Sequence, residues 1–303
     1  MELRIGTSGW NYPAGRGTWN GVFYPFPEDR DRGFDELSFY AERFNTVEVN
    51  SSFYGPPRST AALGWIKRTP AHFDFTVKLY QKFTHPQTSH DASAITREDI
   101  DQFKGGIEPL AAGGRLGALL AQFPSSFQES PEAREYLAWL LREFSQYPMA
   151  IELRHRSWSD AHTDTRALLS AHNAAWVQID EPKFKASIEQ DFTPNIADML
   201  YIRLHGRNAA QWWDHEQSED RYNYHYAAAE LKPIADKVNA ARALVKKVYL
   251  FMNNHFSAQS VANAATLRNL LNEPIKARMP AELVDRYPEL QGTVATFPPS
   301  RLL

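Results

Sequence analysis

Cysteine is absent from this sequence of 303 residues, and its absence excludes a disulfide framework, a thiolate metal site and a cysteine nucleophile. The sequence also lacks an excess of basic residues, since its formal net charge is −3 and its isoelectric point is about 6.4. Proteins that present a broad face to nucleic acid usually show such an excess. A nucleic-acid partner is therefore disfavoured, although it stays an alternative.

Long apolar runs are also missing. No run approaches the roughly 20 residues that a membrane helix needs, so no membrane partner is expected. The first residues, MELRIGTSGW, lack a basic segment followed by an apolar core, so we expect no N-terminal signal peptide. We find no linker rich in glycine or serine and no internal repeat. These absences favour a single cytoplasmic domain and leave the oligomeric state open.

Eight short apolar or alternating segments are present, and each has the composition of a β-strand. Between them lie segments with helical spacing of apolar residues, such as Leu37–Phe44, Ile100–Leu110 and Leu231–Val238. Ser130 followed by Pro131 is typical of a helix start. The expected strands are Leu3–Thr7, Thr46–Asn50, Phe75–Leu79, Ala118–Phe123, Ala150–Arg154, Trp176–Asp180, Tyr201–His205 and Val248–Asn253.

The regular alternation of strand and helix predicts a parallel sheet, and eight repeats favour closure into a (β/α)8 TIM barrel of the α/β class. We assign residues 1–278 to this single barrel domain. The stretch Glu181–Leu200 has a poor helical pattern and is expected to be an irregular crossover between strands 6 and 7. Residues 279–303 contain four prolines and are expected to form a C-terminal extension packed on the barrel.

Several expected strands alternate between apolar and polar residues, whereas fully buried parallel strands usually read as continuous apolar runs. The outer face of a barrel strand must meet the helices, so the apolar set should face outward and the polar set inward. The inward polar residues lie toward the carboxyl ends of the strands, where barrel enzymes hold their sites. They are Glu48, Asn50, Lys78, Gln122, Glu152, Arg154, Asp180, Arg203, His205 and either Asn253 or Asn254.

A purely structural plug of salt bridges would explain the same residues. Burying ions costs several kcal/mol each, however, and apolar packing in their place is often neutral or stabilising. A barrel that needed only stability would fill its interior with Val, Ile and Leu. We therefore interpret the polar interior as a ligand pocket.

The three cations Lys78, Arg154 and Arg203 favour an anionic, phosphate-containing or carboxylated ligand. Glu48, Glu152 and His205 are the candidate catalytic residues, because carboxylates and imidazole can exchange protons with a substrate. The remaining candidates for substrate binding are polar inward residues and aromatic residues of the adjoining loops, namely Trp10, Asn50, Tyr54, Gln122, Asp180, Asn253 and Asn254.

No cofactor is expected. If a divalent metal were bound, Glu48, Glu152, Asp180 and His205 would supply oxygen and nitrogen ligands suited to manganese or magnesium. The three cations in the same interior would repel such an ion, and the sequence contains neither an HxH nor an HExxH spacing. The metal-free interpretation is therefore preferred.

At the same strand ends the sequence resembles the YecE-like proteins, also known as the domain of unknown function 72. The resemblance spans nearly the whole expected barrel and implies a TIM barrel without an established activity. The stretches that carry it are GTSGW at Gly6–Trp10, VEVNSSFY at Val47–Tyr54, FTVKL at Phe75–Leu79, LLAQFPSSF at Leu119–Phe127, IELRHRSW at Ile151–Trp158, YIRLHGR at Tyr201–Arg207 and YLFMNNHFSAQSVANAATL at Tyr249–Leu267.

The sequence departs from this family in two loops. Ser257-Ala258 stands where such proteins typically show a glycine before the alanine. Trp212-Trp213 replaces a tyrosine-containing loop and is the best candidate for an exposed lid. Both differences are expected to lie at the pocket rim.

These features predict an enzyme that binds a small anionic substrate, with hydrolysis of a phosphate-containing bond as the first hypothesis. A sugar isomerase or lyase would use the same carboxylates and the aromatic rim. A non-catalytic protein that binds a metabolite or nucleic acid is the third hypothesis.

Overall fold

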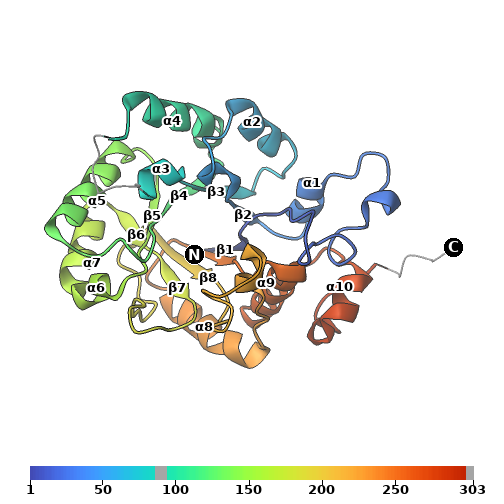
Figure 1. The fold of residues 1–303 in the computed structure, drawn as a ribbon. Coiled ribbons are helices and arrows are strands. Elements are labelled where there is room, and N and C mark those ends of the chain that lie inside the picture. Colours follow the sequence, from blue (N-terminus) through green and yellow to red (C-terminus); the bar gives the residue numbers. More distant parts are fainter. Residues whose placement is uncertain (86–93, 298–303) are drawn as a thin grey trace.

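In the computed structural model, which describes residues 1–85 and 94–297, strands and helices alternate along the chain (Figure 1). The strands are β1 Glu2–Thr7, β2 Thr46–Val49, β3 Asp74–Lys78, β4 Leu116–Gln122, β5 Met149–Glu152, β6 Ala174–Trp176, β7 Gln178–Asp180, β8 Met199–Leu204 and β9 Lys247–Met252. All pairings between these strands are parallel, as the sequence predicts.

Some helices begin where the sequence supplies a capping side chain. Ser130 accepts a hydrogen bond from the amide of Ala133, with Pro131 in the first turn, and Thr96 and Asp99 form a capping box. The α-helices are α1 Glu36–Ala41, α2 Ser59–Lys67, α3 Gln81–Thr84, α4 Arg97–Ala112, α5 Pro131–Glu143, α6 Arg156–Asp160, α7 His162–Ala171, α8 Ala228–Ala241, α9 Gln259–Leu270 and α10 Ala281–Arg286.

The strands form two parallel sheets, ordered β1-β9-β8-β7 and β2-β3-β4-β5-β6. The single strand expected at Trp176–Asp180 is split, because β6 pairs with β5 whereas β7 pairs with β8. Between them, the amide of Val177 donates to the carbonyl of Ile151. At the other edges, Ser8 bridges to Glu48 beyond the end of β1. The two sheets therefore adjoin at both edges.

Side chains from the two sheets also meet across the space between them. The Tyr201 hydroxyl of β8 lies 3.0 Å from the Thr76 hydroxyl of β3. Near the amino ends of the strands, the Tyr249 hydroxyl donates to Asp74 at 2.8 Å. Polar contacts therefore link the inner faces of the two sheets both near the amino ends of the strands and farther along them.

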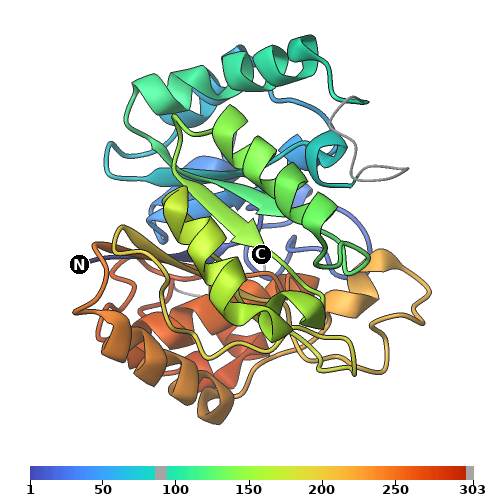
Figure 2. The ribbon, with the colours of Figure 1, turned by 90° about the vertical axis from the view of Figure 1, so that its left-hand side faces the viewer.

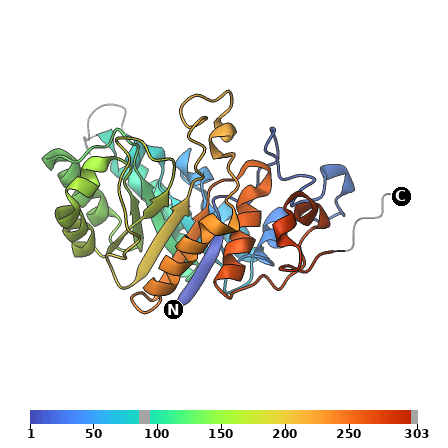
Figure 3. The same ribbon diagram turned by 90° about the horizontal axis from the view of Figure 1, so that it is seen from below.

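Helices cover the outer faces of both sheets. In Figure 2, α4 lies at the top of the molecule, α5 lies across the face turned to the viewer, and the helices of the C-terminal third lie at the bottom. Figure 3 shows α8 and α9 side by side, with α9 next to β1. The outward apolar residues of the strands meet these helices, as where Phe75 stacks on Trp65 of α2 with ring centroids 6.0 Å apart.

Residues 181–198 contain no helix, in agreement with the expected irregular crossover. The described part of the C-terminal segment contains α10 and contributes Met279, Leu283 and Leu290 to the core. Residues 298–303 of the expected extension lie outside the described residues. Among the described residues, no helix combines the length and apolar character needed to cross a membrane.

Backbone strain occurs at Ser257-Ala258, where the family resemblance leads us to expect a glycine. Ser257 has a φ of 48° and Ala258 a φ of 61°, in the left-handed region that costs a residue with a Cβ about 1–2 kcal/mol. Both residues are buried, immediately before α9. Glycine at position 257 would adopt this φ without the steric cost that serine pays.

We expect Ser257→Gly to raise the free energy of unfolding by about 0.5–1 kcal/mol, because glycine adopts this conformation without steric cost but is freer when unfolded. Urea unfolding followed by circular dichroism measures the change. Ser257→Ala is the matched control, since it removes the hydroxyl but keeps the Cβ and should give no gain. A glycine variant no more stable than the wild type would contradict the assignment of strain.

Candidate functional site

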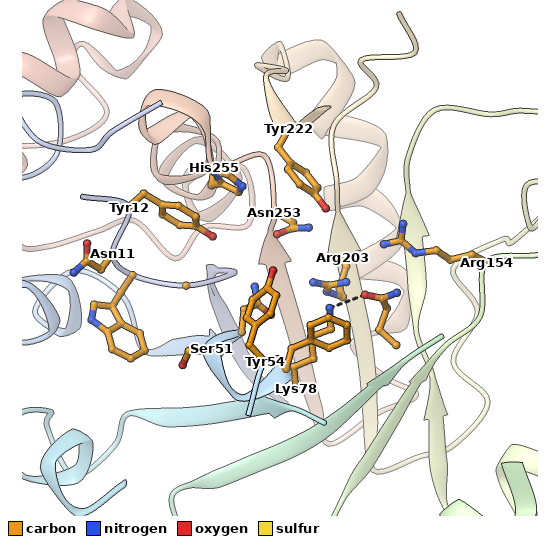
Figure 4. A pocket seen from close by; sticks show the side chains of 15 residues that line it. Asn11, Tyr12, Ser51, Tyr54, Lys78, Arg154, Arg203, Tyr222, Asn253 and His255 are labelled. Atoms are coloured by element: carbon orange, nitrogen blue, oxygen red, sulfur yellow. Dashed lines mark hydrogen bonds between the residues drawn. The ribbon is translucent and has the colours of Figure 1, made fainter. Parts of the chain in front are cut away.

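A pocket of about 370 Å³ lies at the carboxyl ends of the strands. This volume is within the range of small-molecule sites. Cationic, amide and aromatic side chains from both sheets line it, as Figure 4 shows. The lining residues are Gly9, Trp10, Asn11, Tyr12, Asn50, Ser51, Phe53, Tyr54, Lys78, Gln122, Arg154, Arg203, Tyr222, Asn253 and His255.

Arg203 of β8 forms the floor of the pocket and is held by two fully buried carboxylates. Its Nη2 and Nε donate to Glu48 of β2 at 2.7 and 3.0 Å, and its Nη1 donates to Glu152 of β5 at 2.5 Å. The hydroxyl of Tyr201 also donates to Glu48, at 2.8 Å. Because Arg203 lies in one sheet and its two carboxylate partners come from two strands of the other, the fold itself fixes the position of the guanidinium.

Arg154 forms a second cationic group beside Arg203. Its Nε donates to Glu152 at 2.7 Å, and its Nη1 lies 3.4 Å from a carboxylate oxygen of Glu181. Its Nη2 lies 3.2 Å from Nε2 of His205, whose Nδ1 lies 2.9 Å from the amide nitrogen of Asn253. Glu152, Glu181, Arg154, His205 and Asn253 therefore form one continuous polar network.

Lys78, at the end of β3, is the third cation. Its Nζ donates to Oε1 of Gln122 at 2.6 Å and lies 4.0 Å from the centroid of the Phe53 ring. Within residues 1–85 and 94–297, no carboxylate is within ion-pair distance of this amine. Figure 4 shows Lys78 and Arg203 between Arg154 on one side and Tyr12 on the other.

The two arginines remain charged at neutral pH, and so does Glu152. Burial would raise the pKa of Glu152, but the charges of Arg203 and Arg154 outweigh it and hold the pKa well below its usual range. Burial lowers the pKa of His205 to about 3, although Glu152 opposes this shift. At neutral pH, Glu152 therefore has no proton to donate, and His205 is a neutral imidazole.

Lys78 differs from these groups because its charge changes near neutral pH. Burial lowers the pKa of its amine to about 7, Arg203 adds to the lowering, and Glu152 and Glu48 oppose it. The two guanidinium groups are already paired with carboxylates, Arg203 with Glu48 and Glu152, and Arg154 with Glu152 and Glu181. Protonation of Lys78 therefore adds one positive charge that has no carboxylate partner among the described residues.

Aromatic rings form the walls opposite the cations. The rings of Tyr12 and His255 stack with centroids 4.1 Å apart, and His255 also contacts Tyr222 at 5.0 Å. Burial lowers the pKa of His255 to about 3, so this ring is neutral. Tyr54 is largely exposed at the rim. A flat or apolar part of a ligand would find stacking surfaces here.

The structure places most of the predicted site residues in or directly beneath this pocket. Glu48, Glu152 and His205 are fully buried and do not line it. The candidates for substrate binding that do line it are Trp10, Asn50, Tyr54, Lys78, Gln122, Arg154, Arg203 and Asn253.

The expected place of Asp180 beside the other inward residues is wrong. Asp180 accepts hydrogen bonds from Arg207 at 2.7 and 2.8 Å and from the Tyr226 hydroxyl at 2.8 Å, outside the pocket lining. Its neighbour Glu181 reaches Arg154 instead. Trp176 and Gln178 lie on one face of this segment, and the side chains of Gln178 and Asp180 find hydrogen-bond partners away from the pocket. The polar residues of this strand therefore do not face inward, contrary to the expectation.

Asn254 also lies outside the pocket, because its amide nitrogen donates to the carbonyl of Tyr224 and to Asn263. It holds the segment before α8 against α9, and Asn253 alone reaches the site. The proposed lid is only partly exposed, since Trp212 is buried whereas Trp213 is 64% exposed.

The four residues expected to bind a divalent metal, if one is present, do not converge on one site. Asp180 lies elsewhere, and the guanidinium of Arg203 lies between Glu48 and Glu152. Among the described residues, no group of three or more His, Cys, Asp or Glu side chains is arranged to hold a metal ion.

Sequence reasoning missed two residues that matter here. His255 follows Asn253-Asn254 directly after the last strand, and this position at a strand end could have identified it as a site residue. Glu181 was assigned to the crossover, although it is one residue beyond β7. Tyr12, Phe53 and Tyr222 were recognisable only as aromatic residues of neighbouring loops.

A family model described as "Protein of unknown function DUF72" matches residues 4–285. The UPF0759 protein YunF of Bacillus subtilis is 27% identical over 288 residues, which cover 93% of this chain and 99% of that protein. The UPF0759 protein YecE of Escherichia coli K12 is 32% identical over 127 residues, 41% of this chain and 43% of that protein.

Solved structures of the same family show the same fold. A DUF72 family protein from Thermotoga maritima MSB8 is 33% identical with a TM-score of 0.77, covering 90% of this chain and 100% of that one. A DUF72 family protein from Enterococcus faecalis V583 is 24% identical with a TM-score of 0.76, covering 89% and 95%.

Proposed function

The chain belongs to the DUF72 family of proteins of unknown function, and we propose that it binds a small anionic ligand in the pocket lined by Lys78, Arg154 and Arg203. We further propose that the two sheets are the halves of one TIM-like barrel, with this pocket at the carboxyl ends of its strands. Sites in such barrels lie at that end.

The observation that carries the proposal is the isolation of Lys78. A cation inside a pocket normally gains a carboxylate partner, because an unpaired buried charge is costly. Among residues 1–85 and 94–297, the direct contacts of the Lys78 amine are a hydrogen bond to the Gln122 carbonyl and the face of the Phe53 ring, and it forms no ion pair. A ligand phosphate or carboxylate would supply the missing negative charge.

Two further features support an anion at this position. The hydrogen bonds from Arg203 to Glu48 and Glu152 use three of its five N–H groups, so its planar fork is oriented in advance and retains donors. Oδ1 of Asn50 is a buried acceptor without a partner among the described residues. It would accept a hydrogen bond from a hydroxyl or amine of the ligand.

Hydrolysis stays a prediction within this proposal. In the proposed site, Glu48 and Glu152 orient Arg203 rather than exchange protons with the ligand, since both carboxylates are fully buried and ion-paired. His205 holds Arg154 and Asn253 in a similar way. The groups able to touch a ligand are those that line the pocket.

Inorganic phosphate should stabilise the protein through this pocket. If its dissociation constant is near 1 mM, 10 mM phosphate adds about 1.4 kcal/mol to the free energy of unfolding. The melting temperature at pH 6.5 should then rise by about 2–4 °C. Lys78→Met should lose most of this rise, because the amine is the cation without a competing carboxylate.

Lys232→Met provides the control, since Lys232 is an exposed helix residue paired with Asp236. Chloride at the same ionic strength controls for screening of surface charges. An equal response to phosphate in Lys78→Met and the wild type would overturn the proposal.

A further inference from the structure

The amine of Lys78 has the surroundings of a nucleophile. One of its N–H groups is held by Oε1 of Gln122 at 2.6 Å, and the amide of Gln122 is itself anchored because its nitrogen donates to the carbonyl of Phe123 at 3.1 Å. The Phe53 ring covers one side of the amine. The nitrogen is therefore positioned, partly desolvated and open to the pocket.

We infer that Lys78 forms an imine with a small anionic aldehyde or ketone, an inference that rests on the proposed anion pocket. Free phosphate would contact all three cations, whereas the anionic group of such a compound would lie against Arg203 and Arg154 and its carbonyl carbon at Nζ of Lys78. The proposal thus narrows the ligand to a class that carries both a phosphate or carboxylate and a carbonyl.

The covalent step balances without an oxidant or reductant. The lone pair of the neutral amine attacks the carbonyl carbon, the C=O π bond breaks, and a proton moves from nitrogen to oxygen to give a carbinolamine. The nitrogen then forms a double bond to carbon as the hydroxyl leaves and takes a proton to become water. One amine and one carbonyl compound give one imine and one water.

The charges around Lys78 favour a neutral amine. Arg203 of β8 and Arg154 after β5 repel its proton, and His85 after α3 is neutral because burial lowers its pKa to about 4. Glu48 and Glu152 oppose this effect but are engaged by the arginines. With a pKa of about 7, roughly half of the amine is unprotonated at neutral pH, whereas an ordinary lysine is almost entirely protonated.

Reductive trapping tests the inference. The protein is incubated at pH 7 with dihydroxyacetone phosphate and sodium cyanoborohydride, and the adduct on each lysine is quantified by peptide mass spectrometry. Dihydroxyacetone is the matched probe without the phosphate. Lys78→Arg keeps the charge and prevents the imine, and the phosphate-induced rise in melting temperature is measured on the same preparations.

We expect the adduct at Lys78 to exceed that at the exposed Lys232 by at least about 10-fold, because far more of the Lys78 amine is neutral. We also expect dihydroxyacetone phosphate to label Lys78 better than dihydroxyacetone does. If phosphate stabilises the protein but Lys78 is not labelled preferentially, the proposal of an imine is wrong, whereas the proposal of an anion pocket is still supported. Equal labelling by both probes, without stabilisation by phosphate, would overturn the anion pocket and the proposed substrate class together.

Discussion

Replacing Arg203 with methionine should lower the free energy of unfolding by about 3–5 kcal/mol, the loss expected when one partner of a buried ion pair is removed. The side chain is 2% exposed, and both of its carboxylate partners are fully buried. Methionine would leave two negative charges from β2 and β5 close together without their shared cation. Equilibrium unfolding in urea, followed by circular dichroism, measures the loss.

Two variants separate this effect from a general loss of packing. Lys232→Met breaks an exposed pair whose side chains are each 57% exposed, and it should cost less than about 1 kcal/mol. The double variant Glu48→Gln, Arg203→Met removes the Arg203–Glu48 pair, keeps Glu152 paired with Arg154, and should recover part of the stability. The double variant also keeps the test informative if Arg203→Met does not fold. A loss under 1 kcal/mol in Arg203→Met would show that the carboxylates need no cation.

The second large effect has the opposite sign, because Lys78→Met should stabilise the protein near and below pH 7. A lysine whose pKa falls from 10.5 to about 7 on folding is charged in a place that disfavours its charge. Removing it should add on the order of 3 kcal/mol to the free energy of unfolding at pH 6. The rise in melting temperature caused by phosphate should be lost in the same variant.

The dependence on pH follows from proton linkage. Between pH 7 and 10.5 the unfolded chain binds more protons at Lys78 than the folded protein does, so wild-type stability attributable to this residue rises with pH. The advantage of Lys78→Met should therefore be greatest at and below pH 7 and shrink by about 2–3 kcal/mol toward pH 9. Urea unfolding at pH 6, 7, 8 and 9 measures this trend.

Lys78→Arg is the matched control for charge. Arginine cannot lose its proton in this range, so its penalty should not diminish with pH. The charged groups near the site, namely Arg203, Arg154, Glu48 and Glu152, and the neutral His85 are the same in all three proteins. A constant difference between Lys78→Met and the wild type from pH 6 to 9 would contradict a lowered pKa for Lys78.

Much of this architecture follows from local pattern. Glu48, Glu152 and Arg203 were expected together because parallel strands end at a common edge and side chains alternate with a period of two. The same reasoning failed at Asp180, because Arg207 and Tyr226 supply hydrogen-bond partners for its carboxylate on the side away from the pocket. Alternation distinguishes the two faces of a strand, but the partners in the folded protein decide which face points inward.

The sequence by itself determined the alternation of strand and helix, the parallel pairing and the set of polar residues at the strand ends, because these depend on spacing along the chain. Only the tertiary structure decided that Glu48, Glu152 and His205 lie beneath the pocket, and that Lys78 alone among the three cations has no carboxylate partner among the described residues. Depth, desolvation and pairing depend on which side chains arrive from distant strands. Spacing along one chain segment carries no information about them.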